Sequence, residues 1–172
     1  GNPSPAAGEH EFVSGTVITA SVESVVDSGS TRYVCTGWSM LDHEPASGGG
    51  TTNIFTITNN ASLTWNWDTN HYFTISAGAN GSVDKLSQWV AAGDALEVEA
   101  MPDPYYHFDV WSGDLSGSIN PASITSDAPK SVVALFTENL ATNGTPEWWL
   151  VQYGLGVADS NALADSDFDT ML

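Results

Sequence analysis

Three aspartates near the end of the sequence have the type and spacing that could bind a metal ion. Asp165, Asp167 and Asp169 stand at alternate positions, and calcium prefers carboxylate oxygens in this arrangement. A complete calcium loop also needs a glycine after the third acid and a later bidentate acid. Thr170 stands where that glycine is expected, and the sequence stops at Leu172. The sequence therefore predicts calcium as a cofactor at these aspartates, with a solvated acidic tail as the alternative interpretation.

Histidines and serines give no comparable pattern. His10 and His43 each stand between two acids, but neither has the spacing to a second histidine that a zinc site needs. No serine lies in a nucleophile elbow, and no glycine-rich loop leads to a lysine. We therefore interpret both histidines as surface-loop residues and expect a protein without catalytic residues, not an enzyme.

Two tryptophans are candidate ligand-binding residues. Trp65 and Trp67 alternate with Thr64 and Asn66, so one face of this strand is aromatic. The first interpretation is packing within a sheet, because aromatic side chains carry much of the burial in small β units. The alternative is a platform on which a sugar ring stacks, since exposed aromatic patches often bind ligands.

The composition is strongly acidic. Against 21 acidic residues the chain has three lysines and arginines, giving a net charge of −18. Nucleic acid is a poor partner for such a chain, because phosphate binding needs basic side chains. An acidic surface suits a saline or calcium-rich exterior, where cations screen its self-repulsion. Cys35 is the single cysteine, and no apolar run approaches the roughly 20 residues that span a bilayer.

Residues 71–138 have the pattern of a complete small β unit. An opening strand at 71–78 is followed by a turn, an alternating strand at 95–101 and a closing strand at 130–136. The preceding residues repeat this pattern, and the positions that we align are Gly15 with Gly93, Trp38 with Trp111, and Ile57 with Ile124. The glycines open turns and the tryptophans serve as buried anchors.

The sequence thus predicts a mainly β protein of two tandem, small, β-grasp-like modules, residues 1–70 and 71–138. Residues 139–172 form a linker, a short helix and an acidic tail. For the helix, Thr145 is the expected N-cap, Pro146 the first helical residue and Gly154 the residue after the C-cap.

The alignment leaves the first module without its opening strand. A sheet that lacks a strand exposes backbone N–H and C=O groups at its edge. Neither end of the sequence resembles a natural boundary, so one explanation is truncation of a longer chain. The other is that the same protein or a neighbouring chain fills the gap by strand addition.

Several motifs resemble those of the divergent internalin-type B-repeat domain of bacterial secreted proteins. They include Ala-Gly-Ala-Asn-Gly-Ser-Val from Ala77 and Phe-Asp-Val-Trp-Ser-Gly-Asp from Phe108, and the resemblance extends loosely over residues 1–138. Val110 replaces the usual glycine before Trp-Ser, whereas Gly37 keeps it. Residues 145–169 resemble a helix with a thrombospondin type 3-like calcium segment. The resemblance implies β-rich stalk, adhesion or assembly modules with no catalytic residues, and calcium ligands at the three aspartates.

We therefore expect a non-catalytic structural or adhesive repeat module of a large bacterial surface protein, located outside the cell or on its surface. Self-assembly into filaments by strand complementation would involve the open edge of the first module. The alternative is an accessory carbohydrate-binding region of a large secreted enzyme, with Trp65 and Trp67 contacting the glycan.

Overall fold

The longest strand of the chain, β6 (Ser62–Ala77), contributes to both of the units into which the described residues divide. The computed structural model describes residues 1–157. Its elements are strands followed by one short helix, so the mainly β class expected from the sequence is confirmed. The boundary that the sequence predicts between residues 70 and 71 falls within β6, which runs through this position without interruption.

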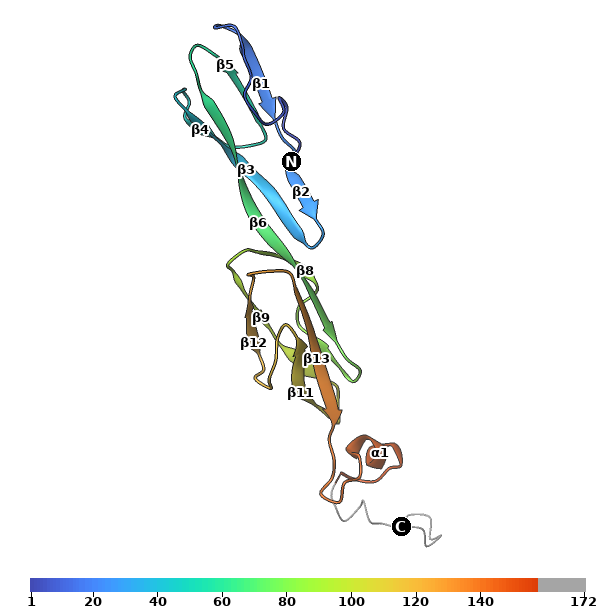
Figure 1. The fold of residues 1–172 in the computed structure, drawn as a ribbon. Helices are drawn as coiled ribbons and strands as arrows, with labels where there is room; N and C mark the ends of the chain where they lie inside the picture. The colour runs from blue at the N-terminus through green and yellow to red at the C-terminus, as the bar shows by residue number, and fades with distance from the viewer. Residues whose placement is uncertain (158–172) are drawn as a thin grey trace. The chain divides into compact units, whose positions relative to one another are not determined.

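The first unit consists of Gly1–Tyr72 together with two short segments, Trp89–Asp94 and Thr125–Pro129. Strand β3 pairs antiparallel with the first part of β6, and β1 pairs antiparallel with β5 (Figure 1). A hairpin joins β2 to β3, and β4 adds two residues to the other end of β3. The bounds are β1 (Val17–Ser21), β2 (Val25–Ser28), β3 (Thr31–Leu41), β4 (Ser47–Gly48) and β5 (Thr52–Thr56).

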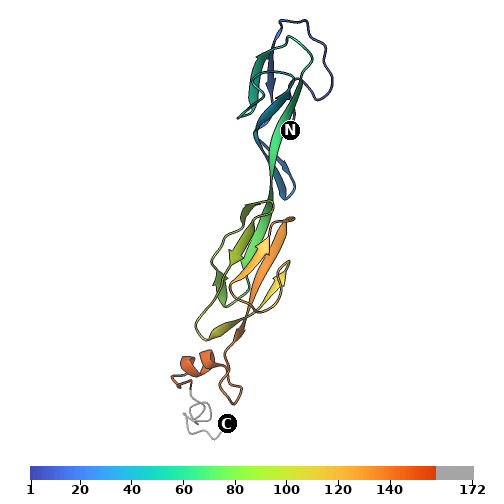
Figure 2. The same ribbon diagram turned by 90° about the vertical axis from the view of Figure 1, so that its left-hand side faces the viewer.

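The second unit consists of Phe73–Gln88, Ala95–Ile124 and the described residues from Lys130 onward. Strand β13 lies parallel to the last part of β6 and antiparallel to β11 (Figures 1 and 2). Two further pairs are β7 with β10 and β9 with β12. Strand β8 pairs with β6, and three of its four residues belong to the first unit. The bounds are β7 (Gly81–Val83), β8 (Gln88–Ala91), β9 (Ala95–Val98), β10 (Ala100–Pro102), β11 (Tyr106–Gly113), β12 (Ala122–Thr125) and β13 (Lys130–Glu138).

One tryptophan is buried in the core of each unit. Trp38 on β3 is 6% exposed and Trp111 on β11 is 2% exposed. In both strands the register shifts just before the tryptophan, and such a bulge re-aims the side chain that follows it. The indole N–H of Trp111 donates to the carbonyl of Ile119 at 2.9 Å. The indole N–H of Trp38 is buried without a hydrogen-bond partner among the described residues.

The expected helix is present as α1 (Glu147–Gln152), which follows β13 and is orange-red in Figure 2. Its C-terminal end agrees with the sequence, because Gly154 has a φ of +73° and Leu155 donates to the carbonyl of Leu150 at 2.8 Å. The N-terminal expectation was wrong by one residue. Pro146 stands at the N-cap, so no side chain caps the helix there.

The different hydrogen bonding of Trp38 and Trp111 predicts different losses of folding free energy when each is replaced by phenylalanine. Trp111→Phe removes a hydrogen bond, whereas Trp38→Phe removes a buried N–H that is unpaired. Both variants lose similar apolar volume, so we expect Trp111→Phe to be more destabilising by about 1 kcal/mol. Urea denaturation followed through amide signals of each unit measures the two free energies of unfolding. Equal losses would contradict this account of the indole hydrogen bond.

Candidate functional site: an unpaired strand edge

The first part of β6 has one edge that no strand within residues 1–157 covers. Successive residues of a strand direct their backbone groups to alternate edges. Even-numbered residues of β6 face β3, as Tyr72 shows by donating to the carbonyl of Ser30 at 2.8 Å. Odd-numbered residues face the other edge, where the Thr69 carbonyl accepts a 2.8 Å hydrogen bond from Ala92. Upstream of Thr69, the strand pairing of β6 is with β3 alone.

The equivalent edge of the second unit is covered by a strand. Trp38 lies opposite Trp65 on β6, and Trp111 lies opposite Ala134 on β13, so Trp65 and Ala134 hold matching positions. The carbonyl of Ala134 accepts a 2.8 Å hydrogen bond from Gly78, just after β6. The edge of β13 that contains Ala134 is thus paired with β6, whereas the edge that contains Trp65 is open.

Residues at matching positions of β6 and β13 differ in burial, as expected if only the edge of β13 is covered by a neighbouring strand. Val132 and Ala134 on β13 are fully buried, each with 0% exposure. Their counterparts on β6, Leu63 and Trp65, are only partly buried. A covering strand removes both backbone and side-chain surface from water, so its presence accounts for the lower exposure in the second unit.

A glycine marks one end of the open edge. A Cβ built on Gly1 would lie 2.7 Å from Val22 and 2.9 Å from the ring of Trp67. A Cβ on Gly81 would lie 2.5 Å from the ring of Phe136, the residue of β13 that matches Trp67. Both glycines therefore lie against an aromatic ring. In the second unit, β6 ends at Ala77, shortly before this glycine.

The candidate ligand residues Trp65 and Trp67 lie along this open edge, and both are partly buried. Nothing in the structure tests them as a sugar platform, and that interpretation stays a prediction. Asp165, Asp167 and Asp169 lie outside the described residues. Within the described part of the chain, no group of three or more histidine, cysteine, aspartate or glutamate residues could hold a metal ion.

The two histidines between acids make local contacts with the backbone. A ring nitrogen of His10 lies 2.6 Å from the carbonyl of Ala6, and one of His43 lies 2.9 Å from that of Thr56. Asp42 and Glu44 line a broad, open cleft beside His43. Neither histidine is positioned by a second ionisable side chain, so the arrangement offers no catalytic pair.

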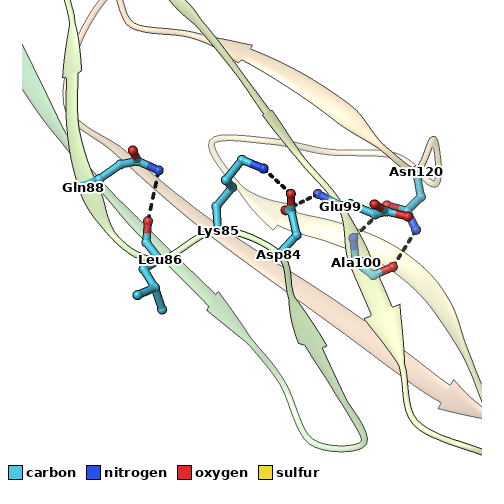
Figure 3. A network of polar contacts seen from close by, with 7 residues as sticks. All are labelled: Asp84, Lys85, Leu86, Gln88, Glu99, Ala100 and Asn120. Carbon is cyan, nitrogen blue, oxygen red and sulfur yellow. Dashed lines mark hydrogen bonds and ion pairs between the residues drawn. The ribbon is translucent and has the colours of Figure 1, made fainter.

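A polar network in the second unit connects neighbouring strands (Figure 3). The carboxylate of Asp84 accepts a 2.7 Å hydrogen bond from the N–H of Glu99 and pairs with Lys85. The Glu99 N–H, followed by Lys85, lowers the pKa of Asp84 from its ordinary value of 3.8. The amide of Asn120 both donates to and accepts from the backbone of Ala100, at 2.8 Å in each case. Apart from Lys85, these partners are backbone groups of neighbouring strands, so the network stabilises the fold.

Comparison with known proteins supports the second unit's relationship to a described family. Residues 72–140 match the family model of the Divergent InlB B-repeat domain, which covers less than half of the chain. This family consists of repeat domains of bacterial surface proteins and is not a known enzymatic family. No curated protein and no solved structure matches the chain. No helix among residues 1–157 is long and apolar enough to cross a membrane.

The network around Asp84 predicts a pH-dependent contribution to stability. Because folding lowers the pKa of Asp84, its stabilising effect is complete above 3.8 and is lost as the pH falls through the lower folded-state value. We expect Asp84→Asn to lower the free energy of unfolding by about 1 kcal/mol at pH 7, since the amide still accepts from Glu99 but carries no charge.

The measurement is urea denaturation of both proteins between pH 7 and pH 2. The difference between them should shrink over the acidic part of this range. Asp109→Asn, at an exposed position on β11, is the matched control and should change the stability little at any pH. A difference between wild type and Asp84→Asn that stays constant from pH 7 to pH 2 would overturn the assignment.

Proposed function

We propose that the chain is a non-catalytic structural and adhesive module of a bacterial surface protein, acting outside the cell. In this proposal, neighbouring chains assemble into filaments when one chain adds a strand to the open edge of β6. The observation that carries the proposal is that edge, whose counterpart on β13 is paired and buried. The family match of residues 72–140 supports the surface-module part.

We further propose that residues 1–70 and 71–138 are two copies of one module. Gly15 and the next residue exchange hydrogen bonds of 2.7 and 2.9 Å with Ile57. Gly93 and the next residue do the same with Ser126, at 2.9 and 2.8 Å. Both glycines have a φ of +91°. These matches support duplication and correct one detail of the alignment, because the counterpart of Ile57 is Ser126 and not Ile124.

An open edge is a physical reason for assembly. Its N–H and C=O groups form a template with which an extended segment pairs, and the main-chain hydrogen bonds supply affinity. Natural proteins usually protect such edges with charged side chains or proline. Residues 62–67 of β6 contain neither, although the chain as a whole carries a net charge of −18. An unprotected edge in so acidic a chain supports a role in strand pairing.

The alternative function is carbohydrate binding within a large secreted enzyme. Trp65 and Trp67 lie on one face of β6 and are only partly buried. Their partial exposure favours contact with a sugar ring over a role in core packing alone. Glycan-array binding that is lost in Trp65→Ala would support it. A strand on the open edge would lie beside the same residues, so the two functions would compete.

Calcium binding by Asp165, Asp167 and Asp169 is a separate proposal that rests on their spacing. We expect calorimetric titration with calcium to give a binding signal that disappears when all three are replaced by asparagine. The matched control replaces Asp27, Asp103 and Asp109 instead, which changes the net charge equally. Loss of the signal in both variants would indicate non-specific attraction to an acidic chain.

Closing the edge within one chain tests the assembly proposal. Residues 72–80, which form the end of β6 and the turn before Gly81, are fused directly before Gly1. We expect the unmodified chain to form concentration-dependent oligomers or filaments, seen by analytical ultracentrifugation and electron microscopy. The fused chain should remain monomeric, because its own added strand covers the edge.

The matched control carries the same fusion with Phe73→Ser and Ile75→Ser in the added segment. Those two residues are buried in the second unit, so the control segment should cover the edge poorly and leave assembly intact. An unmodified chain that stays monomeric at all concentrations would refute assembly through this edge. Equal assembly by the fused chain would place the contact elsewhere.

A further inference from the structure

We infer that the strand accepted at the open edge of β6 runs parallel to β6, in one register, and has the charge-free pattern of residues 73–77. The inference rests on the proposed function and specifies the strand that would be added to the open edge of β6. The occupant is an extended segment of a neighbouring chain, with large apolar residues at two alternate positions and a small residue at the third.

The direction follows from the matching edge of the second unit. There β13 pairs with β6 in parallel, from Lys130 opposite Phe73 to Ala134 opposite Ala77. Trp65 on β6 matches Ala134 on β13. The open edge of β6 therefore offers the same pattern of N–H and C=O groups as the edge of β13 that pairs with β6. We therefore assign the parallel arrangement to the occupant of the open edge.

The register follows from the side chains that the covering strand supplies. Phe73 is 0% exposed and Ile75 is 7% exposed, so this strand contributes two side chains to the core of the second unit. Ile75 lies opposite Val132, whose counterpart in the first unit is Leu63. A shift of one residue would turn both apolar side chains to the opposite face. The occupant therefore places its central apolar residue opposite Leu63.

The third position is restricted by the size of Trp65. In the second unit two alanines lie opposite each other, Ala77 on β6 and Ala134 on β13. In the first unit Trp65 replaces the second alanine, so the space beside the occupant is smaller. A residue no larger than alanine is needed there, because overpacking is itself destabilising.

Charge limits the composition of the occupant. The chain carries −18, and an acidic strand would be repelled, whereas residues 72–78 contain no charged side chain. At its far end the occupant approaches Gly1, which lies against Trp67 as Gly81 lies against Phe136. These two glycines leave room where the covering strand of the second unit turns away.

The test titrates a capped peptide of residues 72–80 into the full, isotope-labelled chain. Binding should shift the amide signals of Leu63, Trp65 and Trp67. A nitroxide on the peptide's C-terminus should broaden signals near Trp67 and Gly1, and a nitroxide on its N-terminus should broaden those near Ala61. The reverse pattern would show antiparallel addition and overturn the inference while leaving strand addition itself intact.

Three variant peptides test the pattern. Phe73→Ser with Ile75→Ser should weaken binding about a hundredfold or more, because both core side chains are lost. Thr74→Asn with Ser76→Asn, at the exposed positions between them, should bind within about threefold of the original. Ala77→Trp should weaken binding at least about tenfold through overpacking against Trp65. Equal binding by all peptides would overturn the proposed register.

The fused chain separates failure of this inference from failure of the proposed function. It should not bind the peptide, since its edge is already covered. If the unmodified chain neither binds the peptide nor assembles, strand addition from a neighbour is wrong, and with it the assembly proposal. If the unmodified chain assembles, the fused chain stays monomeric and the peptide does not bind, assembly still uses the open edge and only this inference is overturned. Binding by the fused chain would show that the peptide lies away from the edge.

Discussion

Backbone hydrogen bonding along β6 is the constraint on which the rest of the structure depends. Buried N–H and C=O groups need partners, so a strand of 16 residues must be matched along its length. β3 satisfies one edge of its first part, and β13 pairs with its last part. The other edge of the first part has no partner strand within the described residues. A single strand thus has a completed pairing along one part and an incomplete one along the other, and the proposed assembly rests on the incomplete one.

Two buried tryptophans show that the two units satisfy the hydrogen bonding of buried polar groups to different degrees. Trp111 donates its indole N–H to a backbone carbonyl, whereas Trp38 finds no acceptor among the described residues. An unpaired buried N–H costs free energy that apolar packing must offset. In addition, Leu63 and Trp65 stay partly exposed while Val132 and Ala134 are buried. Both differences leave the first unit with fewer satisfied interactions than the second. The free energy gained by adding a strand would therefore be larger in the first unit.

Much of the fold could be predicted because strand side chains alternate with a period of two. That period identified the strands around Trp65 and Phe73, and the turn glycines followed from their need for positive φ. The same period continues past residues 70 and 71, since Leu63, Trp65 and Trp67 are in phase with Phe73 and Ile75, as expected of one continuous strand. The Asp84–Glu99 contact and the parallel pairing of β6 with β13 could not be predicted, because both join residues that no local pattern relates.

Alignment of the two segments of the sequence predicts an open edge, but the hydrogen-bonding groups along that edge are seen only in the structure. The alignment alone does not indicate which backbone groups such an edge leaves unpaired. On β6 these groups belong to the odd-numbered residues, because the even-numbered residues face β3, and the bulge before Trp38 determines only which residues of β3 lie opposite them. A matching bulge lies before Trp111, so β11 pairs with β13 in the same register relative to the tryptophan as β3 pairs with β6. Because both bulges fall at the same place relative to the tryptophan, the completed edge of β13 serves as a template for the open edge of β6. We infer the direction, register and side-chain size of the proposed added strand from this one observed pairing of β13 with β6.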